Sequence, residues 1–511
     1  MTMDRPFFVT TPIYYVNDLP HLGHAYPTVA ADALARFMRL DGRRVKFLTG
    51  TDEHGQKVEQ SARAADVSPQ EFADRNSAAF REMDRLLDIS NDDYIRTTEK
   101  RHIRGVQALW RELERRGEIY LGRFAGWYAV RDEAFYDESE LVEGKAPTGA
   151  DVEWFEEDNY FFRLSAWQDR LLDYYEANPE AIAPRSRRNE VISFVKGGLK
   201  DLSISRTSFS WGIPVPGNPK HVIYVWLDAL TNYITAIGYP ETESAEFGVF
   251  WPVAHHIVGK DILRFHAIYW PAFLMAAGLP APRRIFAHGW WTVEGQKMSK
   301  SLGNGVPPEF LVGKYGVDPA RYFLLRELPF GNDGDFSHRA VVGRLNGDLA
   351  NDFGNLAQRV LVMISRNCGA GVPEPGTFEA TETALLDSAH GLLETVRAHV
   401  SEQAFHWALE AIWRVVGDAN RYVDEQAPWV LSRSDPGRMR TVLYTLAETL
   451  RHLAILVQPF VPGSAGRLLD QLAVPEAERC FTALADAPLR PGTRLPKPEG
   501  IFPRFVEEAV R

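Results

Sequence analysis

The chain has 511 residues, of which 57 are Lys or Arg and 68 are Asp or Glu, so its formal net charge is −11. Such a length predicts about three to five folding units, each able to bury a core. No apolar run approaches the ~18–20 residues of a membrane-spanning helix, and the N-terminus lacks a basic segment followed by an apolar one, so we expect a cytoplasmic protein. The acidic excess excludes a protein that coats nucleic acid non-specifically, because phosphate binding depends on Lys and Arg.

The N-terminal part of the chain alternates between strand and helix patterns. Residues 7–11 predict a short buried strand, and residues 45–49 predict a second strand that ends at Asp52. Between them, apolar residues recur at helical spacing over 28–40, with Pro27 close to the helix start, where its missing N–H is tolerated. Strand, helix and strand in this order predict a βαβ unit and a parallel sheet.

A second group of the same kind lies far downstream, with expected strands at 222–226, 256–259 and 285–288 and an amphipathic helix at 262–277. The intervening stretch, 118–220, is rich in aromatic residues, charges and turns. We therefore expect a domain inserted into a split nucleotide-binding fold.

The pattern after residue 340 is helical. Apolar stripes over 345–360, 382–400, 403–424 and 440–457 predict an all-α bundle. The Pro-rich segment 485–499 predicts an extended tail on its surface.

Two short segments carry phosphate chemistry. His21-Leu22-Gly23-His24 lies at an expected helix N-terminus, where free N–H groups favour anions and two histidines could donate to phosphate oxygens. The loop Gly295–Gly303 offers the ammonium groups of Lys297 and Lys300 to a departing pyrophosphate. Taken singly, the first is also compatible with a chance tetrapeptide and the second with a solvated surface loop.

Together, HLGH and KMSKS in this order resemble the signature pair of the class I aminoacyl-tRNA synthetases. Other segments look like methionyl-tRNA synthetases, and the resemblance covers essentially the whole chain. These segments are Thr11 to Asn17, Gly50 to Gly55, Val225 to Ala229, Gly259 to Ile262 and Gln426 to Trp429.

The resemblance implies a Rossmann-like parallel-sheet catalytic domain, split by a connective insertion and followed by an α-helical anticodon-binding domain. It also implies an ATP-dependent ligase that forms methionyl adenylate and pyrophosphate, then transfers methionine to the 3′ end of initiator and elongator tRNA(Met) for translation. The expected segments are the first catalytic half (1–117), the insertion (118–220), the second catalytic half (221–290), the KMSKS loop and stem-contact region (291–340), and the anticodon-binding domain with its tail (341–511).

The same resemblance assigns the nucleotide site. The expected catalytic residues are His21, His24, Lys297 and Lys300. The other ATP-binding residues expected are Gly23, Gly259, Asp261, Met298 and Ser299. Asp261 is also compatible with a cap for the helix at 262–277. Mg²⁺ is expected to arrive with ATP, because no acidic cluster in the sequence indicates a dedicated cage.

The expected methionine pocket has an aromatic and apolar wall, because sulfur makes favourable contacts with aromatic rings. By resemblance, its residues are Ile13, Tyr15, Trp226, Leu230, Tyr233, Ile262 and His266. The family often has Pro where this chain has Leu230. Asp52 is the candidate partner of the α-ammonium group. From periodicity alone, Trp226 and Tyr233 also fit ordinary core aromatics at strand and turn positions.

The insertion has no cysteine, since Cys368 and Cys480 both lie outside it. Many relatives carry zinc-binding Cys-x-x-Cys knuckles in this region, so we expect no bound zinc here. Aromatic packing by Trp127, Tyr128 and Phe135 is expected to hold its tip instead. The insertion is also too short for the hydrolytic editing domain of leucyl, isoleucyl or valyl relatives.

Asn355, Arg359 and Trp429 match the family's anticodon-reading positions, although the first two also fit a solvated helix face and Trp429 a core anchor. The segment 341–511 contains 17 Lys and Arg against 21 Asp and Glu, so tRNA binding must depend on a few placed residues. Arg185, Arg187 and Arg188 are candidates for contact with the tRNA backbone, or simply a solvated face.

Two other functions remain open from the sequence: a catalytically inactive tRNA-binding homologue and a small-molecule nucleotidylyltransferase. Intact phosphate motifs argue against the first, and the length of the chain argues against the second. The chain leaves no room for the C-terminal dimerisation domain of some relatives, so we expect a monomer.

Overall fold

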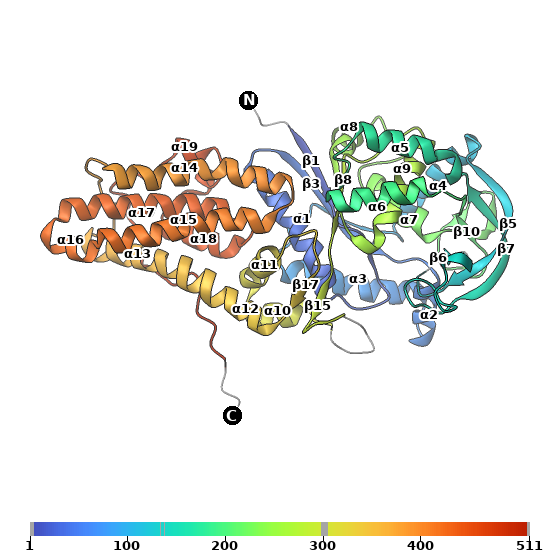
Figure 1. The fold of residues 1–511 in the computed structure, drawn as a ribbon, viewed down its shortest axis with the longest axis horizontal. Coiled ribbons are helices and arrows are strands. Elements are labelled where there is room, and N and C mark those ends of the chain that lie inside the picture. Colours follow the sequence, from blue (N-terminus) through green and yellow to red (C-terminus); the bar gives the residue numbers. More distant parts are fainter. Residues whose placement is uncertain (1–4, 133, 137, 298–304, 508–511) are drawn as a thin grey trace.

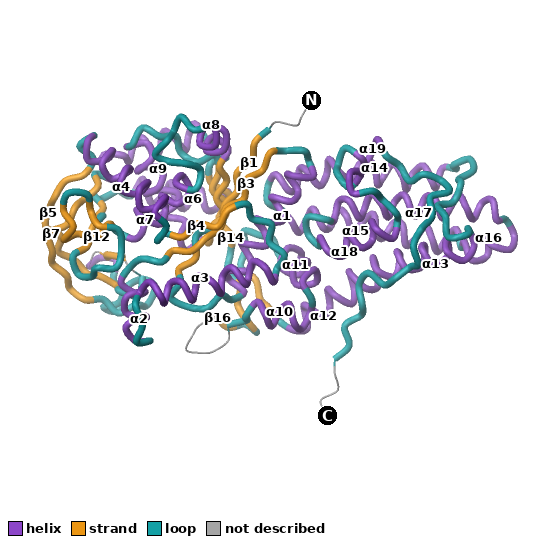
Figure 2. The backbone as a smooth tube through the Cα atoms, turned by 180° about the vertical axis from the view of Figure 1, so that it is seen from behind, coloured by secondary structure: helices purple, strands orange, loops and turns teal. Residues whose placement is uncertain are grey.

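The computed structural model describes residues 5–132, 134–136, 138–297 and 305–507. An α/β half that contains the N-terminal region and a helical half formed by the C-terminal region lie side by side along the long axis (Figure 1). The view from behind shows the strands gathered in the α/β half and the long helices running away from it (Figure 2). The expected combination of a parallel-sheet domain and an all-α bundle is therefore confirmed.

The central sheet has seven parallel strands in the order β2-β3-β1-β13-β14-β8, with β4 also paired to β3. Phe8 and Val9 of β1 are fully buried, as expected for a parallel sheet that is covered on both faces. The strands are β1 (Pro6–Thr10), β2 (Tyr14–Tyr15), β3 (Arg44–Asp52), β4 (Asp93–Arg96), β8 (Ile182–Ala183), β13 (Ala254–Gly259) and β14 (Arg284–His288).

Helices cover both faces of this sheet (Figure 1). Those that contact its strands include α1 (Leu22–Leu40), α3 (Pro69–Leu86), α6 (Arg185–Lys196) and α8 (Ala245–Phe250). The other helices of this half are α2 (Gln56–Ala64), α4 (Lys100–Arg115), α5 (Gln168–Ala177), α7 (Val225–Thr235) and α9 (Trp270–Ala276). A helical segment runs from Lys260 into α9 through a π-helical stretch, Phe265–Tyr269, close to the helix expected at 262–277.

Helix α1 begins earlier than the sequence predicts, at Leu22, so Pro27 lies inside the helix rather than near its start. The side chains at the N-terminus explain the difference. The His21 ring accepts from the Gly23 N–H and the His24 ring accepts from the His21 N–H, which closes a capping box ahead of the proline. The cap offsets the backbone hydrogen bond that Pro27 cannot make.

The strand expected at 222–226 is also wrong in part. Strand β12 (Asn218–Ile223) ends before this run does, and it pairs antiparallel with β10 (Ser205–Arg206) and β11 (Pro214–Val215) in a separate sheet. Val225 and Trp226 instead begin helix α7. A short apolar run does not distinguish a buried helix from a strand, and here it is divided between the two.

Residues 118–220 contribute to three sheets, one of which is the small sheet of β10, β11 and β12. Strands β5 (Ile119–Ala129), β6 (Ala134–Tyr136), β7 (Glu153–Phe162) and β9 (Leu202–Ser203) form an antiparallel sheet. Between β7 and β9 the chain returns to the central sheet, where β8 pairs with β14. In the antiparallel sheet, Trp127 meets Trp154 edge to face, with ring centroids 5.3 Å apart, and Tyr128 is buried. The side chain of Phe135 lies outside the described residues.

A small sheet and three helices connect the two halves. They are β15 (Trp291–Val293), β16 (Gln296–Lys297), β17 (Gly334–Phe336), α10 (Pro308–Tyr315), α11 (Val317–Arg326) and α12 (His338–Arg344). The bundle follows, with α13 (Asn355–Asn367), α14 (Ala380–Ser401), α15 (Phe405–Gln426), α16 (Pro428–Ser434), α17 (Pro436–Val457), α18 (Pro462–Gln471) and α19 (Ala483–Asp486).

The first expected helical stripe of the bundle, 345–360, begins in a π-helical stretch, Leu345–Gly354, that joins α12 to α13. The tail is extended as expected, and it is tied to the loop after α13 by the hydrogen bonds from Val372 N to Thr493 O and from Leu495 N to Ala370 O. Within the described ranges, none of the helices combines the length and apolar character needed to cross a bilayer.

A fully buried ion pair joins the two halves. Arg321 of α11 donates to the Asp32 carboxylate of α1 at 2.6 Å, and neither side chain is exposed. The same guanidinium donates to the carbonyls of Leu87, Pro459 and Phe460, which follow α3 and α17. Burial raises the pKa of Asp32, but Arg321 and Arg36 outweigh that effect, so the pKa lies below its usual range.

We expect Arg321→Gln to destabilise the protein by about 3–5 kcal/mol, because it leaves the Asp32 carboxylate buried without its main partner. Arg36→Gln is the matched control, because Arg36 pairs with the same carboxylate at 2.7 Å but is itself partly exposed. Its loss should lower the free energy of unfolding by less than about 1 kcal/mol. Denaturant unfolding followed by circular dichroism measures both. Equal losses for the two variants would contradict the central role of Arg321.

Candidate active site

A cavity of about 1050 Å³ opens at the carboxyl ends of the central strands. This is where parallel α/β sheets place ligands, because the loops after neighbouring strands converge there. The cavity brings together residues that the sequence predicted from separate motifs. Its lining includes Ile13, Tyr15, His21, Gly23, His24, Asp52, Trp226, Leu230, Tyr233, Gly259, Asp261, Ile262 and His266.

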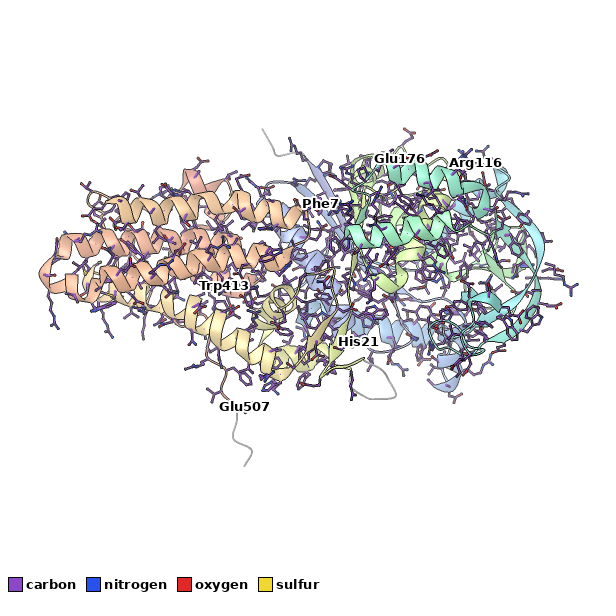
Figure 3. The ribbon with its side chains drawn as sticks, viewed as in Figure 1. Phe7, His21, Arg116, Glu176, Trp413 and Glu507 are labelled. Atoms are coloured by element: carbon purple, nitrogen blue, oxygen red, sulfur yellow. The ribbon has the colours of Figure 1, made fainter. Side chains whose placement is uncertain are left out.

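The two histidines of the first motif stand at the N-terminus of α1, with ring centroids 4.0 Å apart. Figure 3 places His21 at the end of the α/β half that faces β15 and β17. The His24 Nδ1 atom accepts from the His21 N–H at 3.1 Å, so the proton of the neutral ring is on Nε2. Burial, followed by the His21 charge, holds the pKa of His24 well below its usual range. A neutral donor and a helix N-terminus thus face the same cavity.

Asp261 lies just after β13, and its carboxylate accepts a hydrogen bond from the Trp290 indole at 3.1 Å. The alternative that it caps the following helix is wrong, because Gly259 occupies the capping position and no side chain caps that end. Lys260 lies 4.2 Å from the centre of the Trp290 ring and pairs with Asp333 at 2.6 Å. The edge of the cavity around Asp261 is therefore polar, and the Lys260–Asp333 ion pair stabilises it.

The opposite wall is aromatic. Trp226 stacks on Phe265 with ring centroids 3.7 Å apart. The His266 Nδ1–H donates to the Ile262 carbonyl at 3.0 Å, so Nε2 accepts a hydrogen bond from the Tyr233 hydroxyl at 2.7 Å. Burial lowers the pKa of His266 to about 4 and raises that of Tyr233. The wall is uncharged at neutral pH.

Trp226 and Tyr233 both lie on helix α7, not at the strand and turn positions that the sequence suggested. Leu230 lies between them on the same helix and is buried. Asp52 closes the cavity from the other side, as the last residue of β3, and its side chain is 8% exposed. Asp52 thus adds a carboxyl group to the lining at the end of β3.

The second motif is only partly described. The backbone of Lys297 belongs to β16, which pairs with β15, and β15 contributes Trp291 and Thr292 to the cavity. The Lys297 side chain, Met298, Ser299 and Lys300 lie outside the described residues. Only the first residues of this loop, up to Lys297, are therefore described, and they follow a strand that lines the cavity.

Several cavity residues were not anticipated from the sequence: Phe265, Trp290 and Asp333 are the main ones. Phe265 lies three residues beyond the fourth segment of the resemblance, and helical spacing from Ile262 could have identified it. Trp290 and Asp333 had no such signal, because only the pairing of β15 with β17 brings their segments together.

In the bundle, Arg359 lies 5.5 Å from the centre of the Trp429 ring and pairs with Asp424 at 2.7 Å. Asn355 is exposed one turn before Arg359 on α13. Trp429 is 46% exposed, so it is not a core anchor. The three predicted residues thus contribute to one accessible face.

The basic run at the start of α6 is mostly engaged within the protein. Arg187 pairs with Glu190 at 2.7 Å, and Arg188 donates to the Tyr175 carbonyl at 2.8 Å. Arg185 is exposed. Among the residues that the structure describes, no group of three or more His, Cys, Asp or Glu side chains is arranged to hold a metal ion.

Family comparisons cover nearly all of the chain. The family described as tRNA synthetases class I (M) matches residues 7–153 and 148–361, and the anticodon binding domain of methionyl tRNA ligase matches residues 372–511. The chain is 58% identical over 507 residues to a methionine–tRNA ligase of Brucella suis, covering 98% of each protein. It is 55% identical over 517 residues to that of Mycobacterium leprae, covering 99% of this chain and 96% of the relative.

Solved structures give the same result. The methionyl-tRNA synthetase of Mycobacterium tuberculosis in complex with methionyl-adenylate superposes with a TM-score of 0.96, at 55% identity over 98% of this chain and 100% of that chain. Its apo form superposes with a TM-score of 0.89, at 51% identity over 99% of each chain. The similarity therefore extends through both halves of the fold.

The histidines of the cavity give a prediction about pH. Because its folded pKa is about 4, His266 should stay neutral between pH 5 and 8 in the folded protein. The unfolded chain titrates near 6.5 and binds the proton more readily, so this residue's contribution to stability is complete above about pH 6.5 and is lost as pH falls toward 4. NMR of the histidine-labelled protein measures the titration, with the same protein in urea as the control. A folded-state midpoint near 6.5 would contradict the assignment.

Proposed function

The chain belongs to the methionyl-tRNA synthetase family of class I aminoacyl-tRNA synthetases, and we infer that its cavity carries out both steps of methionine–tRNA ligation. It is an ATP-dependent ligase. Methionine and ATP give methionyl adenylate and pyrophosphate, and the acyl group then moves to the 3′ end of initiator or elongator tRNA(Met). The observation that carries this proposal is the single cavity in which paired histidines at a helix N-terminus face an aromatic wall and an acidic residue.

In the first step, the methionine carboxylate attacks the α-phosphorus of ATP, and pyrophosphate leaves. Little covalent help from the protein is needed, so positioning and charge stabilisation dominate. We propose that His21 and His24 donate to phosphate oxygens as negative charge develops. Lys297 and Lys300 attract the departing pyrophosphate, with Met298 and Ser299 completing that loop, and Lys300 is the first choice if only one lysine is essential.

The nucleotide's sugar and base belong on the polar edge of the cavity. We propose that the Asp261 carboxylate accepts from the ribose hydroxyls, as an acidic residue does in other nucleotide-binding folds. Gly23 and Gly259 allow the ligand to approach the backbone. A Cβ atom at Gly259 would lie 2.4 Å from an Asp261 oxygen, so any larger residue there would displace the carboxylate.

Methionine fits the opposite wall. Its thioether has no donor and only a weak acceptor, and the aromatic rings of Tyr15, Trp226 and Tyr233 offer sulfur contacts worth about 0.3–1.5 kcal/mol each. Ile13, Leu230, Ile262 and His266 complete the pocket, and the Asp52 carboxylate pairs with the α-ammonium group. The Tyr233 hydroxyl donates its hydrogen bond to His266, so it is not free to donate to a more polar side chain.

The bundle is proposed to read the anticodon. Single-stranded bases are recognised by stacking on aromatic and guanidinium planes, and Trp429 with Arg359 forms such a surface. Asn355 adds an amide one turn away. Arg185, the exposed member of its run, is the best placed of the three arginines to contact the tRNA backbone.

The remaining properties are proposals of the same kind. Mg²⁺ enters bound to the phosphates of ATP, and the cysteine-free insertion binds no zinc. The protein acts as a cytoplasmic monomer, which light scattering at low micromolar concentration tests for the oligomeric state. The five segments 1–117, 118–220, 221–290, 291–340 and 341–511 serve as its functional divisions, with β8 of the insertion completing the central sheet.

The proposal is tested by ATP–pyrophosphate exchange. Exchange should require methionine, and leucine or cysteine should not replace it. Lys300→Ala should lower the exchange rate by about 10²-fold or more with little change in stability, since the loss is confined to transition-state charge stabilisation. Exchange with leucine or cysteine but not with methionine would reject the assignment.

A second test concerns the bundle. Trp429→Ala should lower the rate of methionyl-tRNA formation by at least about tenfold through loss of base stacking, and leave exchange unchanged. Trp407→Ala is the matched control, because Trp407 is also an exposed tryptophan of the bundle (54%). It lies near the N-terminus of α15, whereas Trp429 follows the C-terminus of that helix. Equal effects of the two substitutions on tRNA charging would contradict the anticodon role.

A further inference from the structure

Two motifs of the resemblance contain residues that the proposed function leaves unassigned. In the segment Gly50 to Gly55, Asp52 lines the cavity and His54 does not. In the segment Val225 to Ala229, Trp226 lines the cavity and Asp228 does not. Asp228 is nevertheless fully buried, which demands partners for its charge.

Both oxygens of the Asp228 carboxylate are engaged by histidines. His54 Nδ1 lies 2.7 Å from one oxygen, and His102 Nε2 lies 2.7 Å from the other. On its far side, the His102 ring contacts the Thr235 hydroxyl through Nδ1 at 3.0 Å. Burial raises the pKa of Asp228, but the two histidines outweigh that effect and lower it, so the carboxylate is an acceptor for both rings.

These contacts join three elements: the end of β3, helix α4 and helix α7. Helices α4 and α7 are in close contact, since a Cβ atom at Gly105 would lie only 2.1 Å from a Thr235 methyl group. His54 is itself held by the edge of the Trp211 ring, at 5.4 Å between centroids, and the Trp211 indole donates to the Glu53 carbonyl at 2.6 Å. The cluster is therefore packed against the Trp211 ring as well as joined to β3, α4 and α7.

Helix α7 has two distinct faces. At about 100° per residue, Trp226, Leu230 and Tyr233 fall on one side and Asp228 and Thr235 on the other. The first face forms the aromatic wall of the cavity, and the second carries the cluster. Any shift of α7 against β3 therefore changes the separation between that wall and the Asp52 carboxylate.

We propose that Asp228, clamped between His54 and His102, is a positioning residue that sets the distance between the methionine side-chain wall on α7 and the ammonium anchor Asp52. The inference rests on the proposed function, because it names what the cluster aligns. Methionine contacts both parts at once, whereas ATP binds at the α1 and β13 edge. Loss of the clamp therefore weakens methionine binding selectively.

The test is a pair of KM values measured by exchange. Asp228→Asn should raise the KM for methionine by about tenfold or more, because a sub-ångström misalignment of two anchors is costly, and it should leave the KM for ATP within about twofold. Glu382→Gln is the matched control: Glu382 is likewise a buried carboxylate held by side chains, here including Arg438, but it lies in the bundle. The control should change neither KM.

The outcomes separate the two proposals. If the unmodified protein has no methionine-dependent exchange, the proposed function fails. If it has exchange and Asp228→Asn leaves the methionine KM unchanged, or raises both KM values equally, only the present inference is overturned. Should Asp228→Asn not fold, Thr235→Val decides, because it leaves the Asp228 carboxylate in place and removes the hydroxyl that contacts His102 and the Asn232 carbonyl of the same helix. It should raise the methionine KM about threefold, and no increase would overturn the proposal.

Discussion

The fold depends on one buried guanidinium. Arg321 satisfies its donors only when α1, the segment after α3 and the segment after α17 meet around it, since Asp32 and three carbonyls from these elements are its partners. An arginine without exposure is strongly destabilising unless every partner is present. The helix that presents His21 and His24 to the cavity is thereby fixed to the bundle. The α/β half and the helical bundle therefore both depend on the contacts of Arg321.

The neighbouring carboxyl of Asp84 is also buried, but its pKa shifts in the opposite direction from that of Asp32. It is buried in α3, and one of its oxygens has no hydrogen-bond partner. Burial, with the charge of Asp32, raises the pKa of Asp84 to about 8, which favours its protonated form at neutral pH. The pKa values of these two carboxyls thus shift in opposite directions, because Asp32 forms ion pairs with Arg36 and Arg321 whereas the more distant charge of Arg81 does not offset the burial of Asp84.

The sequence was sufficient for the architecture and for the contents of the cavity, since motifs after separate strands must converge at the carboxyl edge of a parallel sheet. It was insufficient where side chains compete with local propensity. The start of α1 depends on a histidine capping box that overrides Pro27, and the exposure of Trp429 depends on its neighbours in the bundle. Trp290 and Asp333 become neighbours through strand pairing that no local pattern encodes.

The division of 222–226 between β12 and α7 has a functional consequence. Read as a strand, the run assigns alternate residues to two faces of a sheet, and Trp226 and Asp228 would share a face. Read as a helix, it separates them, because the residues at 226, 230 and 233 point one way and those at 228 and 235 point the other. Trp226 and Asp228 lie two residues apart because the first turn of α7 contributes both to the cavity and to the contacts that hold the helix. Its aromatic residue contacts the ligand space, and its acidic residue holds the helix that bears it.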